Sequence, residues 1–548
     1  MKIKLLCIFT LFFITEVFSQ YKIDNLSFNY GEEILDEKGK VVRIVGEANG
    51  FIYAIGNKKD DFFLKLFTSK EMKMKSNNKI VLPEFKDKEI DFEEAFLLEG
   101  KLYIIGSVYQ KKEKIFNLVA FKVSDDGVVN EKFISLFESN VEKKSERGNF
   151  YFKTSTDDSH LLVMHTSLFK KEDAVKYDLK LFNSNCVKLF SNSEKVVFDD
   201  KKKDFEFTIS DFEVTDNNDT FLVINESYRD KSKKEQVENF HVYAFKESNG
   251  YKKEIIDINI KDKEIINCSM LATKNGKVQL VGFYSSVREN GKANKELKGI
   301  YNATIDIATS INDNLKFNEF DYATKVKLIG ERKAKKGKDL RPTYEIHTII
   351  EKNDGGLIVL SEESLLSIYS QSTAMGLVTV DTYNYTRNEV IVTSLSPNGT
   401  LEWSNVVAKE QSAAYNQIRL NFFIGGFGNG FAVAGGLSLG LGVMGKGPEY
   451  LSIIPIYKDG ELSILFNDNK KNMGITDIEK IKSLGNFNNA VPTLFTFDNQ
   501  GKLTRKDPAE IIKNELVMRP GVYFRKSQQE YIIYSSRKSS DKIGRMTL

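Results

Sequence analysis

The chain has 548 residues, with 79 Lys and Arg against 76 Asp and Glu, and a formal net charge of +3 at pH 7. This near balance argues against a nucleic-acid-binding protein, because neutralising phosphates requires a concentrated positive surface. A composition of 41% hydrophobic and 12% aromatic residues excludes a disordered chain. Three cysteines exclude a disulfide-rich scaffold. Forty Phe and 23 Tyr beside only eight Pro favour strands over helices.

The N-terminus has the pattern of a secretory signal peptide. Lys2 and Lys4 precede the apolar run 5–14, which is too short to span a bilayer as a helix. We predict a signal peptide over residues 1–19 and one mature domain over residues 20–548, with no transmembrane segment in the mature chain. The predicted location is therefore extracytoplasmic: the periplasm, the periphery of an outer membrane, or the medium.

A short pattern recurs along the chain, in which a polar turn precedes a compact apolar run. Apolar runs of four to six residues, rich in β-branched and aromatic side chains, are typical of strands buried on both faces. The intervals between equivalent turn positions are 50, 59, 60, 57, 80, 74 and 99 residues. The eight copies occupy residues 49–56, 99–106, 160–164, 219–224, 275–282, 354–360, 429–435 and 530–534. We interpret these runs as the inner strands of a repeated unit.

A second pattern follows most copies and consists of a strand, a tight polar turn and a returning strand. Asn-Gly or Asp-Gly at such a bend is typical of a β-hairpin. The turns occupy residues 124–127, 247–250, 396–399, 457–460 and 498–501. Two strands, a loop and a hairpin, repeated about every sixty residues, are the pattern of a four-stranded propeller blade.

We therefore predict an all-β fold, a single β-propeller of eight four-stranded blades. The C-terminal segment 541–548 is expected to be the third strand of the last blade, and residues 25–30 its outer strand, so that the two ends close the ring. Seven blades are the alternative count, because the longest interval holds an extra hairpin at 491–505. Two successive smaller propellers or sandwiches are the alternative architecture.

The segment 420–445 carries no charge, which invites interpretation as a membrane helix. Its nine glycines oppose a helix, and two inner strands joined by a turn at 425–430 explain it better. Residues 440–446 match a dinucleotide fingerprint and most of a P-loop. Both motifs need a helix directly afterwards, and Gly447-Pro448 follows instead, so we expect a loop between blade strands.

Few residues have the spacing that chemistry requires. The four histidines, His160, His165, His241 and His347, form no recognisable metal motif, and no Gly-x-Ser-x-Gly elbow occurs. We therefore name no catalytic, ligand-binding or metal residue and predict no cofactor. Cys186 and Cys268 form either one disulfide or two buried thiols after export.

Four further segments have a structural and a functional interpretation. Residues 216–219 and 467–472 are oxygen-rich, but they lack the spacing of a calcium loop, so we expect turns. Trp403 is expected to wedge between blades, with ligand stacking as the alternative. The basic run 331–339 is expected to be a solvated loop, with contact to an anionic surface or polysaccharide as the alternative.

Several segments of the C-terminal third share features with one group of proteins: residues 383–385 and 390–393, 397–403, 465–472, 494–503, 519–520, 531–534 and 545. Together they resemble uncharacterised exported β-propeller-like proteins of Bacteroidota. The resemblance implies export and a propeller fold, and it supplies no activity or catalytic residue.

The expected function is a non-enzymatic binding or scaffold module for a protein or glycan partner in the cell envelope. The alternative is a propeller hydrolase or lyase acting on an extracellular glycan, because propellers carry both kinds of function. Three or more acidic, His, Tyr or Arg side chains converging at one end of the channel would favour the enzyme. A channel mouth of Gly, Ser and aliphatic residues would favour the scaffold.

Overall fold

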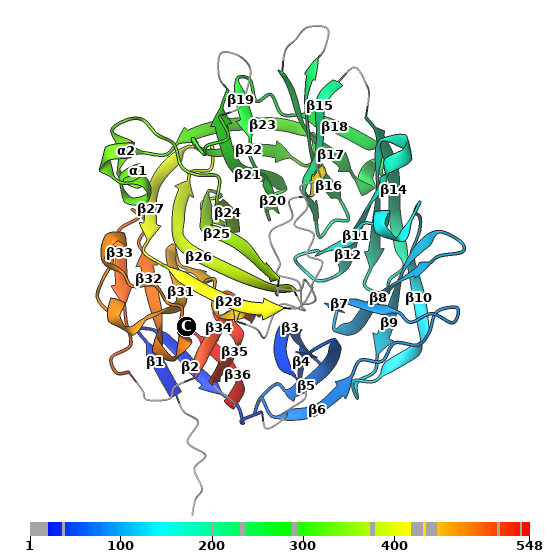
Figure 1. The fold of residues 1–548 in the computed structure, drawn as a ribbon, viewed down its shortest axis with the longest axis horizontal. Helices are drawn as coiled ribbons and strands as arrows, with labels where there is room; N and C mark the ends of the chain where they lie inside the picture. Colours follow the sequence, from blue (N-terminus) through cyan, green and yellow to red (C-terminus); the bar gives the residue numbers. More distant parts are fainter. Residues whose placement is uncertain are drawn as a thin grey trace, which may run out of the picture.

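The chain folds into eight β-sheets arranged around a central axis, as the computed structural model shows (Figure 1). The structure describes residues 20–34, 39–198, 202–230, 236–287, 294–372, 379–417, 431–433, 447–511, 516–537 and 540–548. The prediction of an all-β, eight-bladed propeller is confirmed. The alternatives of seven blades and of two separate units are wrong.

Blades 1 to 4 follow one another along the chain, and the first of the four consecutive strands of each blade lies nearest the axis (Figure 1). Blade 1 holds β3 (Lys40–Ala48), β4 (Phe51–Lys58), β5 (Asp61–Thr68) and β6 (Met74–Lys79). Blade 2 holds β7 (Asp91–Leu98), β8 (Lys101–Gln110), β9 (Ile115–Val123) and β10 (Val129–Asn140). Blade 3 holds β11 (Asn149–Thr154), β12 (His160–Phe169), β13 (Ala174–Asn183) and β14 (Lys188–Val197). Blade 4 holds β15 (Lys202–Val214), β16 (Thr220–Asp230), β17 (Gln236–Phe245) and β18 (Lys253–Asp257).

Blades 5 to 8 keep this plan with additions. Blade 5 holds β19 (Lys263–Ile265) and β20 (Ser269–Ala272), which both pair with β21 (Lys277–Ser286), then β22 (Gly299–Asp306) and β23 (Ile311–Glu319). Blade 6 holds β24 (Tyr344–Glu351), β25 (Leu357–Ser372), β26 (Thr379–Leu395) and β27 (Leu401–Val407), with β28 (Gln411–Gln417) beside β26. Blade 7 holds β30 (Ile454–Lys458), β31 (Glu461–Asn469), β32 (Ala490–Phe497) and β33 (Leu503–Lys506). Blade 8 holds β34 (Val517–Arg525), β35 (Glu530–Arg537), β36 (Ser540–Thr547), β2 (Leu26–Tyr30) and β1 (Gln20–Ile23).

Seven of the eight recurring apolar runs form the second strand of a blade, one place out from the strand nearest the axis. A second strand has a neighbour on each edge and a blade against each face, which is why β4 is buried over most of its length. Of the seventh predicted copy, at 429–435, the structure describes only β29 (Phe431–Val433), which pairs in parallel with β15 at the edge of blade 4. The second strand of blade 7 is β31, which follows the turn Asp459-Gly460.

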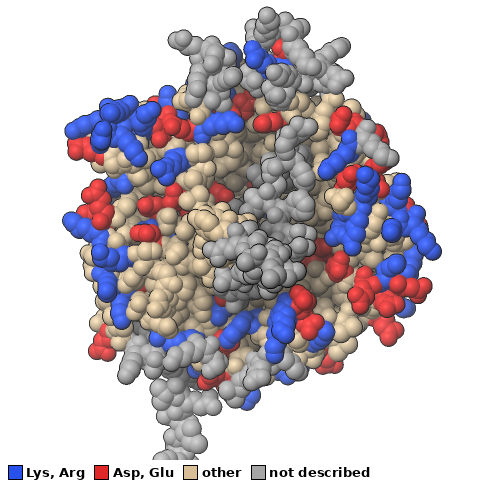
Figure 2. Space-filling view, in the orientation of Figure 1, with Lys and Arg blue, Asp and Glu red and all other residues tan. Residues whose placement is uncertain are grey.

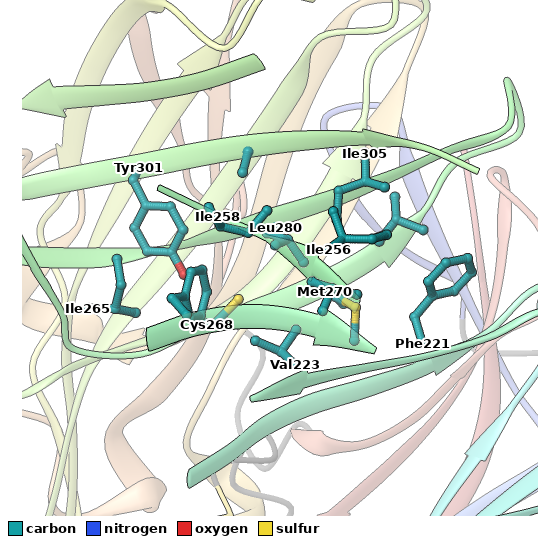
Figure 3. Packing of buried hydrophobic residues seen from close by; sticks show 14 of the residues in the cluster. Phe221, Val223, Ile256, Ile258, Ile265, Cys268, Met270, Leu280, Tyr301 and Ile305 are labelled. Carbon is teal, nitrogen blue, oxygen red and sulfur yellow. The ribbon is translucent and has the colours of Figure 1, made fainter. Parts of the chain in front are cut away.

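The hydrophobic core lies between adjacent blades. Figure 3 shows the interface of blades 4 and 5, where Phe221 and Val223 face Leu280, Tyr301 and Ile305. Burying each large apolar side chain stabilises the fold by roughly 1.5–3 kcal/mol before entropy is counted. Because a blade covers its faces only with its neighbours, the ring must close to bury the faces of the first and last blades.

The ring closes between the two ends of the chain, as the sequence predicted. β2 pairs antiparallel with β36, from Ser27 opposite Thr547 to Tyr30 opposite Gly544, so N-terminal strands complete blade 8. Ion pairs join blade 8 to blade 1 beside this seam. Glu47 of β3 accepts hydrogen bonds from Arg545 at 3.1 Å, and Lys526 lies 2.8 Å from the same carboxylate.

Glu47 should make stability depend on pH at the seam. Burial alone would raise its pKa, but the bonds from Arg545, Lys526 and Ser69 outweigh burial and hold the pKa at about 2, below the usual 4.5. A lowered pKa in the folded state stabilises the protein above about pH 4.5, and this contribution is lost as the pH falls towards 2. The free energy of unfolding of wild type, measured with urea, should fall as the pH is lowered across that window. Glu47→Gln should have a lower free energy of unfolding at pH 7, and that energy should depend less on pH.

The control for this prediction is Glu331→Gln, which removes an exposed pair with Lys335. It should leave both stability and pH dependence near wild type. An unchanged slope in Glu47→Gln would contradict the assigned role of Glu47.

The hairpin turns predicted from sequence also fasten neighbouring blades to each other. In three interfaces an outer-strand Asn amide donates to a turn glycine carbonyl of the next blade: Asn78 to Gly127 at 3.4 Å, Asn318 to Gly399 at 2.8 Å and Asn405 to Gly501 at 2.9 Å. Each of these glycines has a φ near +76°, which favours glycine. The turn therefore sets both the hairpin and the contact with the next blade.

Trp403 wedges between blades 6 and 7, as expected. Its indole N–H donates to the carbonyl of Asn499 at 3.1 Å, and its ring stacks on Phe497 with centroids 5.8 Å apart. Gly501 lies directly against the same ring: a Cβ built there would fall 2.4 Å from Trp403. This close approach requires glycine.

Gly501→Ala should therefore destabilise the protein by more than backbone strain alone. Gly250 is the matched control, because its φ of +70° is similar and a Cβ there would meet nothing within 4 Å. We expect a cost of about 1 kcal/mol for Gly250→Ala and about 2–4 kcal/mol for Gly501→Ala, measured by urea unfolding. Equal costs would contradict the wedge.

Two expectations about local structure are corrected or decided. The run 331–339 is not entirely a loop, because its first four residues form the short helix α2 (Glu331–Ala334), which follows α1 (Tyr322–Ile329). The side chain of Asp321 caps α1 by accepting the Thr324 N–H at 2.6 Å. Cys186 and Cys268 are buried free thiols, so they form no disulfide.

Other expectations fall outside the described residues. These are the signal peptide at 1–19, the turn at 425–430 and the loop at 440–446, while of the segment 420–445 only β29 is described. Within the described part of the chain, no helix has the length and apolar character needed to cross a membrane.

Candidate functional site

Acidic residues on the innermost strands form a first group between blades 1 and 2. Arg43 of β3 forms an ion pair with Glu94 of β7, and Glu94 also accepts the Ala95 N–H at 2.9 Å. Glu93 accepts a hydrogen bond from the Ser107 hydroxyl. Burial raises the pKa of both glutamates.

A second group joins blades 3, 4 and 5. Lys153 of β11 lies 3.3 Å from Glu213 and 3.9 Å from Asp211, both on β15. The Asp211 carboxylate accepts the Met270 N–H at 2.7 Å and the Phe212 N–H at 2.9 Å. Burial raises the pKa of Glu213 to about 7. The oxygens of this group therefore bind backbone amides and a lysine of neighbouring blades.

These two groups contain residue types that are common in active sites. Their hydrogen bonds and ion pairs, however, are those of structural contacts between strands. A glycosidase needs two carboxylates facing each other across a cleft that admits the substrate. Here each described carboxylate of the two groups bonds a cation, a hydroxyl or a backbone amide. Glu94, Asp211 and Glu213 therefore connect neighbouring blades, and Glu93 bonds the adjacent strand of its own blade.

The residues singled out from sequence lie in separate places. The histidine contacts are His160 with Ser159, His165 with the Arg147 carbonyl at 2.7 Å, His241 with Asp257 at 2.9 Å and His347 with Ser452 at 2.9 Å. Among the described residues, no cluster of three or more His, Cys, Asp or Glu side chains could hold a metal. Asp216 and Asp219 accept backbone N–H groups of Asp157 and Glu247, and Asp468 pairs with Arg505 at 2.9 Å.

A groove of about 420 Å³ lies between blades 6 and 7 beside Trp403. Lys352 lines this groove, 2.6 Å from Glu402 and 3.3 Å from Asp354. Phe497 and Gly501 lie against the Trp403 ring, so the indole belongs to the blade interface, and it also lines this groove.

Blade 6 departs from the repeat in a way that the sequence analysis missed. β25 has 16 residues and β26 has 17, and both continue past the blade. β24 pairs with β25 only as far as Glu363. Beyond it, β25 from Ser364, β26 up to Thr386 and β28 form a three-stranded extension, which we name the arm. Figure 1 shows the arm reaching from blade 6 towards the centre of the ring.

A buried charge network holds the root of the arm. Lys409, which is fully buried, donates to Glu362 at 2.8 Å and to the Arg387 carbonyl at 2.8 Å. Arg387 donates to the other oxygen of Glu362 at 3.1 Å. His347 lies beside this network, and burial lowers its pKa to about 4, so it is neutral at pH 7.

Gln411, the first residue of β28, ties the root to blade 7. Its amide donates to the Asn467 carbonyl at 2.6 Å and accepts the Ser452 N–H at 3.2 Å. The arm is therefore fixed to two blades at its base.

The arm itself is nearly free of charge. Its three strand segments contain one charged residue, Asp381, in a chain that is 28% charged. Tyr383, Tyr385 and Tyr415 stack within it, with centroids 5.2 and 5.9 Å apart. Leu365, Ile368 and Tyr369 are 42%, 48% and 61% exposed. No described strand pairs with the outer edge of β25 between Leu365 and Ser372.

These features define the chain as an eight-bladed β-propeller with a nearly uncharged sheet extending one blade. No protein-family model matches the chain, and no curated protein sequence matches it. Among solved structures, it is similar to the WD40 domain of SCAP from fission yeast, with 9% identity over 96% of this chain and 98% of that one and a TM-score of 0.35.

Two further similarities concern proteins of different kinds. An uncharacterised Listeria monocytogenes protein is 11% identical over 83% of this chain and 92% of that one, with a TM-score of 0.31. An α-L-arabinofuranosidase from Fusarium graminearum is 9% identical over 60% of this chain and 96% of that one, with a TM-score of 0.29. Such weak likenesses carry no argument about function.

The arm root should be sensitive to loss of one charge. Lys409→Met leaves Glu362 buried beside Arg387 alone, and we expect a loss of about 3–5 kcal/mol in urea unfolding. The matched control is Lys352→Met in the groove, where the partner Glu402 is 34% exposed; its cost should be about 1 kcal/mol. In Glu362→Gln/Lys409→Met, the cost should be smaller than the sum of the single variants. Additive costs would contradict the network.

Proposed function

We propose that the protein is an exported binding module whose blade 6 arm binds a protein partner outside the cytoplasm. One observation carries the proposal: the arm is a nearly uncharged sheet with exposed apolar side chains and an edge that no described strand covers. Natural edge strands usually carry charges, prolines or bulges that prevent pairing with other chains. β25 from Leu365 to Ser372 carries no charge and no proline.

The arm favours recognition of an extended segment of the partner. An open sheet edge binds such a segment by main-chain hydrogen bonds, and neighbouring pockets select its alternate side chains. Ile368 and Tyr369 supply apolar contacts at that edge, and tyrosine is enriched in binding interfaces. The buried network at the root fixes the arm before binding, which lowers the entropy cost of association.

The bonding of the acidic groups supports binding over hydrolysis. Glu94, Asp211 and Glu213 bond cations of neighbouring blades, Glu93 bonds Ser107 of its own blade, and each of these carboxylates already has a partner. The signal peptide predicted at residues 1–19 and the resemblance of the C-terminal third to exported Bacteroidota proteins support a partner in the periplasm, at the outer membrane or in the medium.

Affinity capture from an envelope extract tests the proposal with three immobilised proteins of residues 20–548. Wild type should capture a reproducible protein partner. Ile368→Lys/Tyr369→Lys should lose at least about tenfold of it, because charged groups desolvate poorly at an interface. The control Ile255→Lys/Ile311→Lys should keep it, because both side chains are 57% exposed but lie on outer strands β18 and β23.

A screen of glycan degradation with the same proteins tests the enzymatic alternative. The proposal expects no turnover. Glycan loss that persists through purification, or equal capture by the arm variant and wild type, would overturn it.

A further inference from the structure

The insertion between β23 and β24 concentrates positive charge. Its segment Glu331–Arg341, which we name the basic segment, contains six Lys and Arg and two acids, a net +4. The whole chain is +3, so the remainder of the chain is −1. Figure 2 shows the resulting cluster of Lys and Arg over α1 and α2 at the upper left of the molecule.

The two acids of the basic segment do not neutralise its other cations. Glu331 pairs with Lys335 at 2.6 Å, and Asp339 pairs with Lys325 of α1 at 2.9 Å. Five exposed cations remain without an ion-pair partner among the described residues: Arg332, Lys333, Lys336, Lys338 and Arg341. Their uncompensated charge distinguishes the segment from the mixed-sign turns elsewhere.

The insertion is anchored firmly to the propeller. Leu328 and Ile329 of α1 pack against buried residues that include Leu297 and Leu340, and Leu297 and Leu340 exchange backbone hydrogen bonds at 2.8 and 3.1 Å. Lys327 donates to Asn405 of blade 6 at 2.6 Å. The five cations are therefore held on a fixed base.

The composition of the basic segment indicates which kind of partner it can bind. Its two apolar residues, Ala334 and Leu340, are buried, so it lacks the apolar centre of a protein interface. A surface dense in phosphate groups needs neither a pocket nor an apolar contact and attracts each nearby Lys or Arg. We propose that the basic segment docks the propeller onto the phosphate headgroups of an anionic membrane surface. This site is independent of the arm.

Vesicle sedimentation tests the proposal on the chain 20–548. Wild type should sediment with phosphatidylcholine vesicles containing about 30% phosphatidylglycerol, not with pure phosphatidylcholine, and about 0.5 M salt should release it. Arg332→Gln/Lys333→Gln/Lys336→Gln should bind roughly a hundredfold more weakly.

The matched control is Lys70→Gln/Lys111→Gln/Lys112→Gln, which removes three exposed charges elsewhere and should bind within about twofold of wild type. Thermal unfolding should show that both variants fold as wild type. Three results would overturn the proposal: no sedimentation of wild type with anionic vesicles, equal loss in both variants, or binding to soluble dextran sulfate without binding to vesicles.

Discussion

The architecture depends on closing a ring of sheets, none of which can bury both its faces alone. The apolar side chains of each blade pack against those of the next, so an open ring would expose two complete faces to water. The closing contact joins residues about 500 positions apart, where β2 completes blade 8 beside β36. Chain entropy opposes such a long loop, although the cost grows only slowly with length.

Ion pairs between blades also hold the ring together, and the residues that form them do not make up an active site. Arg43, Glu94, Lys153 and Asp211 lie on the innermost strands, yet their bonds run from blade to blade. Buried polar groups are costly unless they are bonded, and these bonds meet that requirement. Acids near a propeller axis are therefore weak evidence of catalysis when each has a structural partner.

Much of the fold was predictable because it repeats. A turn followed by an apolar run marks the second strand of seven blades, and the segment 25–30 was recognisable as a closing strand. The position of these runs within a blade was not predictable, because apolar character indicates that a strand is buried and does not indicate how far it lies from the propeller axis. The helix α1 was missed because eight residues show too little periodicity, and its Asp321 cap is a single residue.

The arm was the main feature that sequence reasoning did not find. The sequence from Ser364 to Val380 carries no charge, which is consistent with the arm. The repeated pattern, however, predicts only the part of β25 that begins at Leu357. The buried network had a weaker signal: Glu362 and Lys409 each come one or two positions after a buried apolar run. Their pairing depends on tertiary contacts between β25 and the segment after β27, which spacing alone does not reveal.

The open edge of the arm can be measured directly by amide hydrogen exchange on the free protein. In an antiparallel edge strand, alternate N–H groups point to the paired neighbour and to solvent. Every second amide from Leu365 to Ser372 should exchange fast while its neighbours, bonded to β26, stay protected. Uniform protection along this stretch would show that the edge is already covered and would contradict the account.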